Sequence, residues 1–319
     1  MRVLTIGESM GLIRGEGIGG LERLATASID TGGAEGNTAV GLARLEVPVT
    51  WLGRVGDDAL GRRVTAELRS EGVDTIAVID AAAPTGLMLK STPRAGVTVV
   101  DYYRAGSAGS RLSPADLDRV DFSRYGVLHI TGITLALSAS ARATVFEAVT
   151  RARTQGLLVS FAVNHRTKLW SRAEARTFCA QILPQIDILF ASDDEASLLV
   201  GTADHLQPDD LQPADLAAAL SALGPRETIV TLGGRGSVAA IDGVRHRVAA
   251  EPITPVDTVG AGDAFAAGYL AARASGEPVA ERLHVATRCG ALACLHPSDW
   301  QGAARPSDLR SHSVDTVVR

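Results

Sequence analysis

The stretch Asp-Thr-Val-Gly-Ala-Gly-Asp-Ala-Phe at 257–265 sets a carboxylate, Asp263, on a glycine-rich turn in front of the alanine-rich run 264–274. Such a run favours a helix, whose first N–H groups lack intrahelical partners and carry partial positive charge. Gly260 and Gly262 let a ligand approach the main chain closely, which is the usual arrangement for binding phosphate. Asp263 is therefore either a helix cap or a general base for a hydroxyl that attacks a phosphoryl group.

A second glycine cluster, Thr-Gly-Gly-Ala-Glu-Gly-Asn, occupies 31–37. It does not form the GxGxxG fingerprint of dinucleotide-binding folds. We interpret Gly32 and Gly33 as a turn that presents backbone N–H groups to a substrate, followed by a helix that carries Asn37. A tight turn capped by Asn37 is the structural alternative.

Tyr102, Tyr103 and Arg104 end a predicted strand. Because side chains alternate along a strand, Tyr102 and Arg104 share one face and Tyr103 lies on the other. Arginine offers a fork to a carboxylate or phosphate, and tyrosine adds an amphipathic wall. This face could bind an acidic ligand, although surface packing is the commoner role of such residues.

Further polar groups follow predicted strands, at the edge where open α/β sheets bind ligands. Asn164, His165 and Arg166 come after 157–163. Ser192 and Glu195 have the spacing of a capping box, and Glu195 could also order Mg²⁺ through water.

The glycine turn at 231–237, Thr-Leu-Gly-Gly-Arg-Gly-Ser, lies between two predicted strands. It is either a simple hairpin or the edge of a nucleotide site.

The elements that must position these groups follow from hydrophobic patterning. Strands are predicted at 2–7, 49–56, 125–132, 157–163, 186–192 and 227–233, with helices at 138–155, 171–183 and 213–223. This alternation predicts an α/β fold with a mostly parallel central sheet and helices on both faces.

Two regions, 9–31 and 85–104, interrupt the alternation. The second reads as an antiparallel hairpin turning at 93–96. Together they would form a small β-sheet lid, inserted discontinuously into one domain spanning 1–319. The end of the chain, 311–319, is expected to fray. The unpaired edges of a lid predict at least a homodimer, packed lid on lid.

Composition limits the partners. The chain has 319 residues, 46% hydrophobic and 21% charged, with a formal net charge of −5, so nothing favours nucleic acid or an anionic membrane. No apolar run approaches the ~18 residues of a membrane span, and we expect a cytoplasmic protein with small-molecule ligands.

The three cysteines, Cys179, Cys289 and Cys294, show no CxxC spacing and are expected to be buried thiols. The histidines form no HExxH pair, so no zinc site is predicted.

The stretch 257–270, Asp-Thr-Val-Gly-Ala-Gly-Asp-Ala-Phe-Ala-Ala-Gly-Tyr-Leu, resembles the C-terminal signature of the ribokinase-like (PfkB) carbohydrate kinases. The Gly-Gly and Asn of 32–37 match that family's first motif, and the resemblance covers essentially the whole chain. Within the family, the segments 101–113, 129–138 and 163–170 resemble the 2-keto-3-deoxygluconate kinases.

The resemblance implies ATP-dependent phosphorylation of the terminal hydroxyl of 2-keto-3-deoxygluconate, giving 2-keto-3-deoxy-6-phosphogluconate. It implies Asp263 as the base and the backbone of Gly260, Ala261 and Gly262 as the anion hole. It further implies a substrate site of Gly33, Asn37, Tyr102, Arg104, Ile133, Arg166 and Asp299, and a nucleotide site of Ser192, Thr231, Gly233 and Gly236. ATP and Mg²⁺ are the implied cofactors, with Glu195 acting on the metal through water. The loops flanking the signature could supply carbonyl oxygens for K⁺.

The chain departs from the family at several positions. Ala162 and His165 stand where relatives commonly have Asp and Tyr, and Ser192 stands where they often have Asn. Met88 aligns with a Tyr of the gluconate-type kinases, which removes a substrate hydrogen bond. The gluconate or galactonate epimer, a neutral sugar such as fructose, and 5-dehydro-2-deoxygluconate therefore stay open as substrates. A catalytically silent sugar-acid binder is the alternative outside enzymes.

Overall fold

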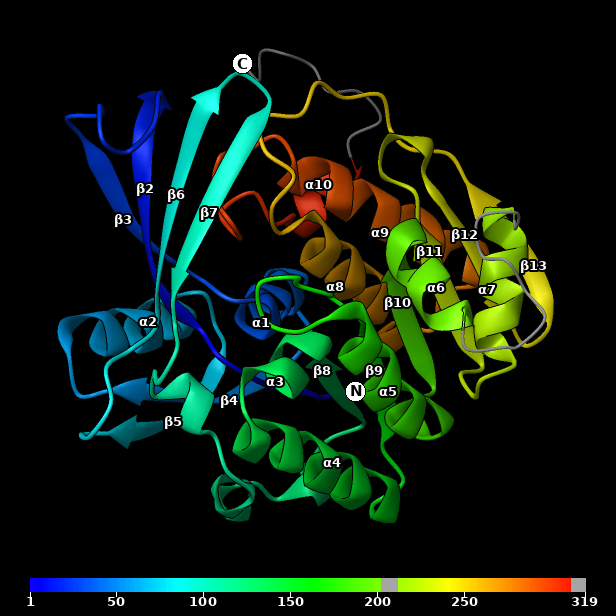
Figure 1. Ribbon diagram of the computed structural model, residues 1–319. Coiled ribbons are helices and arrows are strands. Elements are labelled where there is room, and N and C mark those ends of the chain that lie inside the picture. The colour runs from blue at the N-terminus through cyan, green and yellow to red at the C-terminus, as the bar shows by residue number, and fades with distance from the viewer. Residues whose placement is uncertain (202–211, 311–319) are drawn as a thin grey trace.

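The computed structural model describes residues 1–201 and 212–310, which form two β-sheets and the helices that cover the larger one (Figure 1). The large sheet has nine strands in the order β13-β12-β11-β10-β9-β8-β1-β4-β5. Its strands are β1 (Val3–Ile6), β4 (Val49–Gly56), β5 (Asp74–Asp80), β8 (Val127–Thr131), β9 (Leu158–Ala162), β10 (Ile188–Ser192), β11 (Glu227–Thr231), β12 (Ser237–Ile241) and β13 (Val244–Val248). Pairing is parallel from β11 to β5, and β12 and β13 add an antiparallel edge.

Helices cover both faces of this sheet. They are α1 (Ala34–Arg44), α2 (Ala59–Ser70), α3 (Gly132–Leu137), α4 (Ala139–Thr154), α5 (Arg172–Ile182), α6 (Asp193–Val200), α7 (Pro213–Ser221), α8 (Ala261–Ala274), α9 (Val279–Ala293) and α10 (Pro306–Arg310). The buried core divides into two main clusters. One joins the sheet to α4, α5, α6 and α7, and the other joins it to α1, α2, α8 and α9. The central strands β1 and β8 are buried at every residue because both of their faces are covered.

The second sheet has four strands in the order β3-β2-β6-β7 and stands out from the body beside α1 and α8 (Figure 1). It comprises β2 (Met10–Ile18), β3 (Ala27–Gly32), β6 (Leu87–Arg94) and β7 (Val97–Tyr103). The β2–β6 pair is parallel, and the two outer pairs are antiparallel. Met10, Leu12 and Met88 form a small buried cluster on its inner face, whereas Ile29 and Tyr103 are exposed.

The predicted fold class is confirmed: a mostly parallel sheet covered on both faces, with a second, smaller sheet. Each of the six predicted strands overlaps an observed one, and the hairpin at 85–104 is β6 and β7. The strands β5 and β13 were not predicted. The expectation that 311–319 frays lies outside the described residues.

All three cysteines are buried, as expected. Burial raises the pKa of Cys179 and of Cys289 to about 12, so these thiols are inert at neutral pH. In the described part of the chain, no helix has both the length and the apolar character needed to cross a membrane.

Candidate active site

The signature turn leads directly into α8. Gly260 is the N-cap residue with φ +82°, and a Cβ atom there would overlap the carbonyl oxygen of Asp299, so only glycine fits. Around Gly262, in contrast, a Cβ atom would meet nothing within 4 Å. Within the described residues the N–H groups of Gly262 and Asp263 have no hydrogen-bond partner, while that of Ala261 reaches Thr258 O at 3.3 Å. The start of α8 thus offers free N–H groups of the kind that bind anions, and the anion hole itself stays a prediction.

Asp263 is the third residue of α8 and lies within its first turn, and the N-cap residue is Gly260, so the interpretation of Asp263 as a helix cap is wrong. Its carboxylate accepts a hydrogen bond from Asn37 Nδ2 at 2.8 Å and a longer one from Asn164 Nδ2 at 3.4 Å. Asn37 comes from α1, and Asn164 follows β9 with φ +42°. The alternative that Asn37 caps the tight turn before α1 is also wrong, because its side chain donates to Asp263 and no side chain caps the helix at Gly33.

The surroundings of Asp263 raise its pKa into the range that suits a general base at neutral pH. Burial raises its pKa to about 7, against the opposing effects of Asn37, of the positive charge of Arg166 and of Asn164. The carboxylate of Glu35 adds a small further rise. A base with a pKa near the working pH is substantially ionised and still binds a proton strongly enough to drive proton transfer.

Glu35 itself was not predicted. It is fully buried on α1, and Oε1 accepts hydrogen bonds from the hydroxyls of Thr131 at 2.7 Å and Thr134 at 2.6 Å. Burial raises the pKa of Glu35. Its place in the first glycine motif, two residues before Asn37, was the available sequence signal.

A pocket of about 480 Å³ opens beside the start of α8. It is lined by the predicted nucleotide residues Ser192, Thr231, Gly233 and Gly236 together with Ala261 and Gly262 of the predicted anion hole. Gly236 has φ +92°, and a Cβ atom there would overlap the carbonyl oxygen of Val248. The apolar wall formed by Pro252, Ile253 and Phe265 was not predicted. The pocket therefore joins a partly apolar wall to free backbone N–H groups, a combination that suits a nucleotide.

Ser192 and Glu195 form the predicted capping box of α6. Both oxygens of Glu195 accept backbone N–H groups, one from Ser192 at 2.8 Å and one from His165 at 2.7 Å. The capping role accounts for Glu195, and its action on a metal through water stays a prediction.

A second pocket, of about 570 Å³, lies between the small sheet and the segment after β9, and Tyr102, Arg104 and Arg166 line it as predicted. Arg104 is buried and paired with Glu8, whose Oε2 lies 2.8 Å from Nε and 2.6 Å from Nη2. Within the described residues Arg166 has no ion pair, and Nη1 donates a long hydrogen bond to His165 O at 3.4 Å. Of the two arginines, Arg166 is the one without a salt bridge in the described chain, although its charge also acts on Asp263.

Gly33, Ile133 and Asp299 do not line this pocket. Gly33 has φ +148°, and a Cβ atom there would overlap the carbonyl oxygen of Glu8, the residue that holds Arg104. Ile133 is buried in α3. Asp299 is buried and lies 3.0 Å from the ammonium of Lys90 on β6, a contact that was not predicted.

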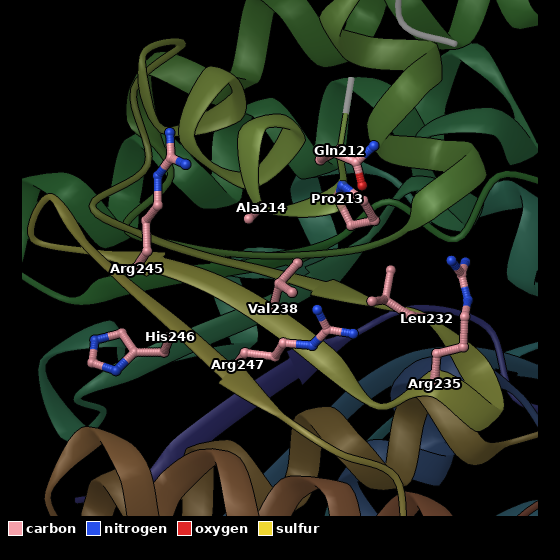
Figure 2. A pocket seen from close by; sticks show the side chains of 9 residues that line it. All are labelled: Gln212, Pro213, Ala214, Leu232, Arg235, Val238, Arg245, His246 and Arg247. Carbon is pink, nitrogen blue, oxygen red and sulfur yellow. The ribbon is translucent and has the colours of Figure 1, made fainter. Parts of the chain in front are cut away.

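A further hollow lies between α7 and the β12–β13 edge, and Figure 2 shows the side chains that line it, among them Arg235, Arg245 and Arg247. Arg235 pairs with Asp193 at 2.5 Å and Arg245 with Asp215 at 2.9 Å, so two of the three charges are compensated. Arg245 and Arg247 belong to neither of the two predicted sites. Asp263 does not line this hollow.

Taken together, the fold, the two pockets and the buried carboxylate beside a glycine turn are typical of a phosphotransferase. A family model described as pfkB family carbohydrate kinase matches residues 2–302, and the chain belongs to this family.

Similar proteins include sugar-acid and sugar kinases. The chain is 33% identical to a 2-dehydro-3-deoxygluconokinase of Bacillus subtilis, over 97% of this chain and 94% of the relative. It is 34% identical to a 2-dehydro-3-deoxygalactonokinase of Haloferax volcanii, over 91% and 90%. It is also 34% identical to a fructokinase of Klebsiella pneumoniae, over 82% and 85%.

Two similar solved structures are of ligand-bound proteins. A putative ribokinase II from E. coli in complex with ATP and Mg²⁺ superposes with a TM-score of 0.85 at 26% identity, covering 97% of each chain. A fructokinase double mutant from Vibrio cholerae in a fructose-, ADP- and potassium-bound form superposes with a TM-score of 0.83 at 26% identity, covering 97% of this chain and 96% of that one.

Proposed function

We propose that this carbohydrate kinase phosphorylates the terminal hydroxyl of 2-keto-3-deoxygluconate with ATP, producing 2-keto-3-deoxy-6-phosphogluconate and ADP. The observation that carries the proposal is Asp263, a carboxylate with a pKa of about 7 beside the free N–H groups at the start of α8. The pocket lined by Tyr102, Arg104 and Arg166 lies on the substrate side.

In the proposed reaction, Asp263 takes the proton of the substrate hydroxyl as that oxygen attacks the γ-phosphorus. The bond between the γ-phosphorus and the bridging oxygen of ADP breaks, and ADP leaves with that electron pair. The backbone N–H groups of Gly262 and of neighbouring residues face the charge that spreads over the phosphoryl oxygens. Asn37 and Asn164 hold the carboxylate in place for proton transfer.

The residues of this chain fit ATP better than a resident metal. No cluster of three or more His, Cys, Asp or Glu side chains suited to a metal exists within the described residues. Mg²⁺ keeps several waters and is commonly bound through substrate phosphates and few carboxylates, so it would enter with ATP. When bound, it supplies charge neutralisation on the phosphates. Assistance by Glu195 through water, and by K⁺ at the loops flanking the signature, are parts of the same proposal.

The choice of a sugar acid rests on Arg166, whose charge lines the pocket without an ion-pair partner in the described chain. A neutral sugar has no group that would compensate it, whereas a carboxylate does. Fructose and 5-dehydro-2-deoxygluconate are the alternative substrates within the family. The similarity to fructokinases favours fructose among these alternatives.

The proposal is tested by ADP release with Mg·ATP and 2-keto-3-deoxygluconate, beside 2-keto-3-deoxygalactonate, fructose and ribose. Asp263→Asn is assayed in parallel, and its kcat should be lower than that of the wild type by about 10²-fold or more, which is the usual contribution of a general base. Turnover of fructose or ribose alone would overturn the sugar-acid assignment. No turnover of any sugar by a folded protein would favour the silent binder.

A further inference from the structure

Lys90 is a buried cation on the inner face of the small sheet. Its ammonium lies 2.5 Å from Asp257 Oδ2 and 3.0 Å from Asp299 Oδ1, and all three side chains are buried. The chain has only two lysines among 31 cationic side chains, and the other, Lys168, is exposed. The lysine ammonium is a compact point charge, and here it lies within reach of both carboxylates.

The two partners of Lys90 flank the turn that forms the anion site. Asp257 opens the turn, and its Oδ1 accepts the N–H of Val259 at 3.1 Å. Asp299 packs its carbonyl oxygen against Gly260 from the other side. A second residue of the small sheet, Thr98 on β7, donates to Asp257 Oδ1 at 3.2 Å. The small sheet therefore contacts the phosphate turn through a buried ion triad.

Removing Lys90 from this place would leave two buried carboxylates without their shared cation. Unpaired buried charge is costly, and the like charges of Asp257 and Asp299 repel. Their negative charge would also lie next to the N–H groups that must attract phosphate, and oppose its binding. Movement of the small sheet away from α8 would withdraw this cation and produce that situation.

We propose that Lys90 is a positioning residue through which closure of the small sheet, acting as a lid, completes the anion hole. The inference rests on the phosphotransfer proposed above and on the mobility of the lid. In the closed state the ammonium neutralises Asp257 and Asp299 and fixes the turn at Gly260–Gly262. In the open state Lys90 no longer holds the turn, and the two carboxylates repel phosphate. Transfer of the phosphoryl group to water is therefore suppressed until sugar binding closes the lid.

The kinetic test compares Lys90→Met with Arg14→Met. Arg14 lies opposite Lys90 in the β2–β6 register, but it pairs with Asp30 of the same sheet, at 3.7 Å. Both variants lose one cation from the inner face of the lid, and only Lys90→Met cuts an ion pair to the turn. The readout is the ratio of ADP release with sugar to ADP release without sugar, measured alongside the melting temperature.

For Lys90→Met we expect this ratio to fall at least about tenfold, mainly through kcat, as for loss of oxyanion stabilisation. Arg14→Met should stay within about twofold of wild type. A folded Lys90→Met protein with an unchanged ratio would overturn the proposal, as would equal losses in both variants. The sugar used is whichever one the wild type turns over, so failure of the sugar-acid assignment is seen separately.

A second measurement needs no variant. The amines of wild-type protein are acetylated with an N-hydroxysuccinimide ester, and peptide mass spectrometry follows Lys90, Lys168 and the N-terminal amine. We expect Lys90 to react at least about tenfold more slowly than Lys168, because its reaction requires opening. A non-hydrolysable ATP analogue with the sugar should slow Lys90 further and leave the N-terminal amine unchanged. Equal rates at Lys90 and the N-terminal amine, with or without ligands, would overturn the proposal.

Discussion

At the scale of single residues, the proposed role of Asp263 as the base predicts how activity depends on pH. The base must be ionised, so kcat/KM should rise with pH to a plateau, with a midpoint near the pKa of about 7. Asn37 donates to the carboxylate and lowers its pKa, so Asn37→Ala should move the midpoint to higher pH by about 0.5–1 unit. Asn164→Ala, which removes the longer bond, should move it less in the same direction. A midpoint that moves to lower pH in Asn37→Ala would contradict this description.

The same carboxylate costs stability. Because burial raises its pKa from 3.8 to about 7, the folded state binds the proton more tightly, and the free energy of unfolding falls as pH rises across that range. Asp263→Asn avoids this loss. Allowing for the solvent contact that Asp263 keeps, we expect a gain of about 1–2 kcal/mol at pH 8. Melting temperatures of both proteins at pH 5 and pH 8 provide the check, and a gain no larger at pH 8 than at pH 5 would refute the linkage.

Arg166 and Arg104 line one pocket but should respond differently to mutation. Arg166 has no carboxylate partner in the described chain, so Arg166→Ala should raise KM for a sugar acid by about 10–100-fold and KM for fructose by less than about threefold. Arg104→Ala would leave Glu8 buried without its partner and should lower the free energy of unfolding by about 3–5 kcal/mol. Steady-state kinetics and denaturant titration separate the two effects. An equal rise in KM for acid and neutral sugars in Arg166→Ala would remove the carboxylate assignment.

At the scale of elements, the start of α8 offers a matched pair of glycines. A methyl group on Gly262 would enter open space within the anion hole, and helical Ala is favoured over Gly, so Gly262→Ala should keep or slightly raise the melting temperature. Its kcat/KM for ATP should fall by about 10²–10³. Gly260→Ala would collide with the Asp299 carbonyl at positive φ and should lower the melting temperature as well. Full ATP activity in Gly262→Ala would show that phosphate does not bind there.

The elements were predictable where their residues carry a local signal. The strand β8 is an uninterrupted buried run, and the turn before α8 is set by two glycines, so both could be read from the sequence. The strand β13 has mostly exposed, polar residues at the edge of the sheet and shows no apolar pattern. It was missed because its stabilisation comes from pairing with β12.

Residues whose role depends on distant partners were harder to predict. Lys90 reads as an ordinary strand lysine, because its partner Asp299 lies 209 positions along the chain. Glu35 meets Thr131 across 96 positions. For Asp263 the glycine turn signalled an anion site, but only the fold shows that its partners are Asn37 and Asn164.

At the scale of the whole molecule, the outer face of the small sheet exposes Ile29, Val99 and Tyr103, which are 49%, 39% and 62% accessible. The edge strands β3 and β7 carry unpaired backbone groups. We therefore expect a homodimer packed through this sheet, with Tyr103→Lys shifting it towards monomer by placing like charges across the interface. Light scattering over a range of concentrations measures this, and a wild-type monomer at assay concentration would refute the expectation.

The central place of β1 has a consequence for synthesis. The strand pairs with β4 on one side and with β8 on the other, where Val3 lies opposite Val127. A ribosome adds roughly 5–20 residues per second, so the first strand made waits on the order of ten seconds for its second neighbour. During that interval a largely apolar segment has one open edge on the nascent chain, and chaperone demand should be greatest before β8 emerges.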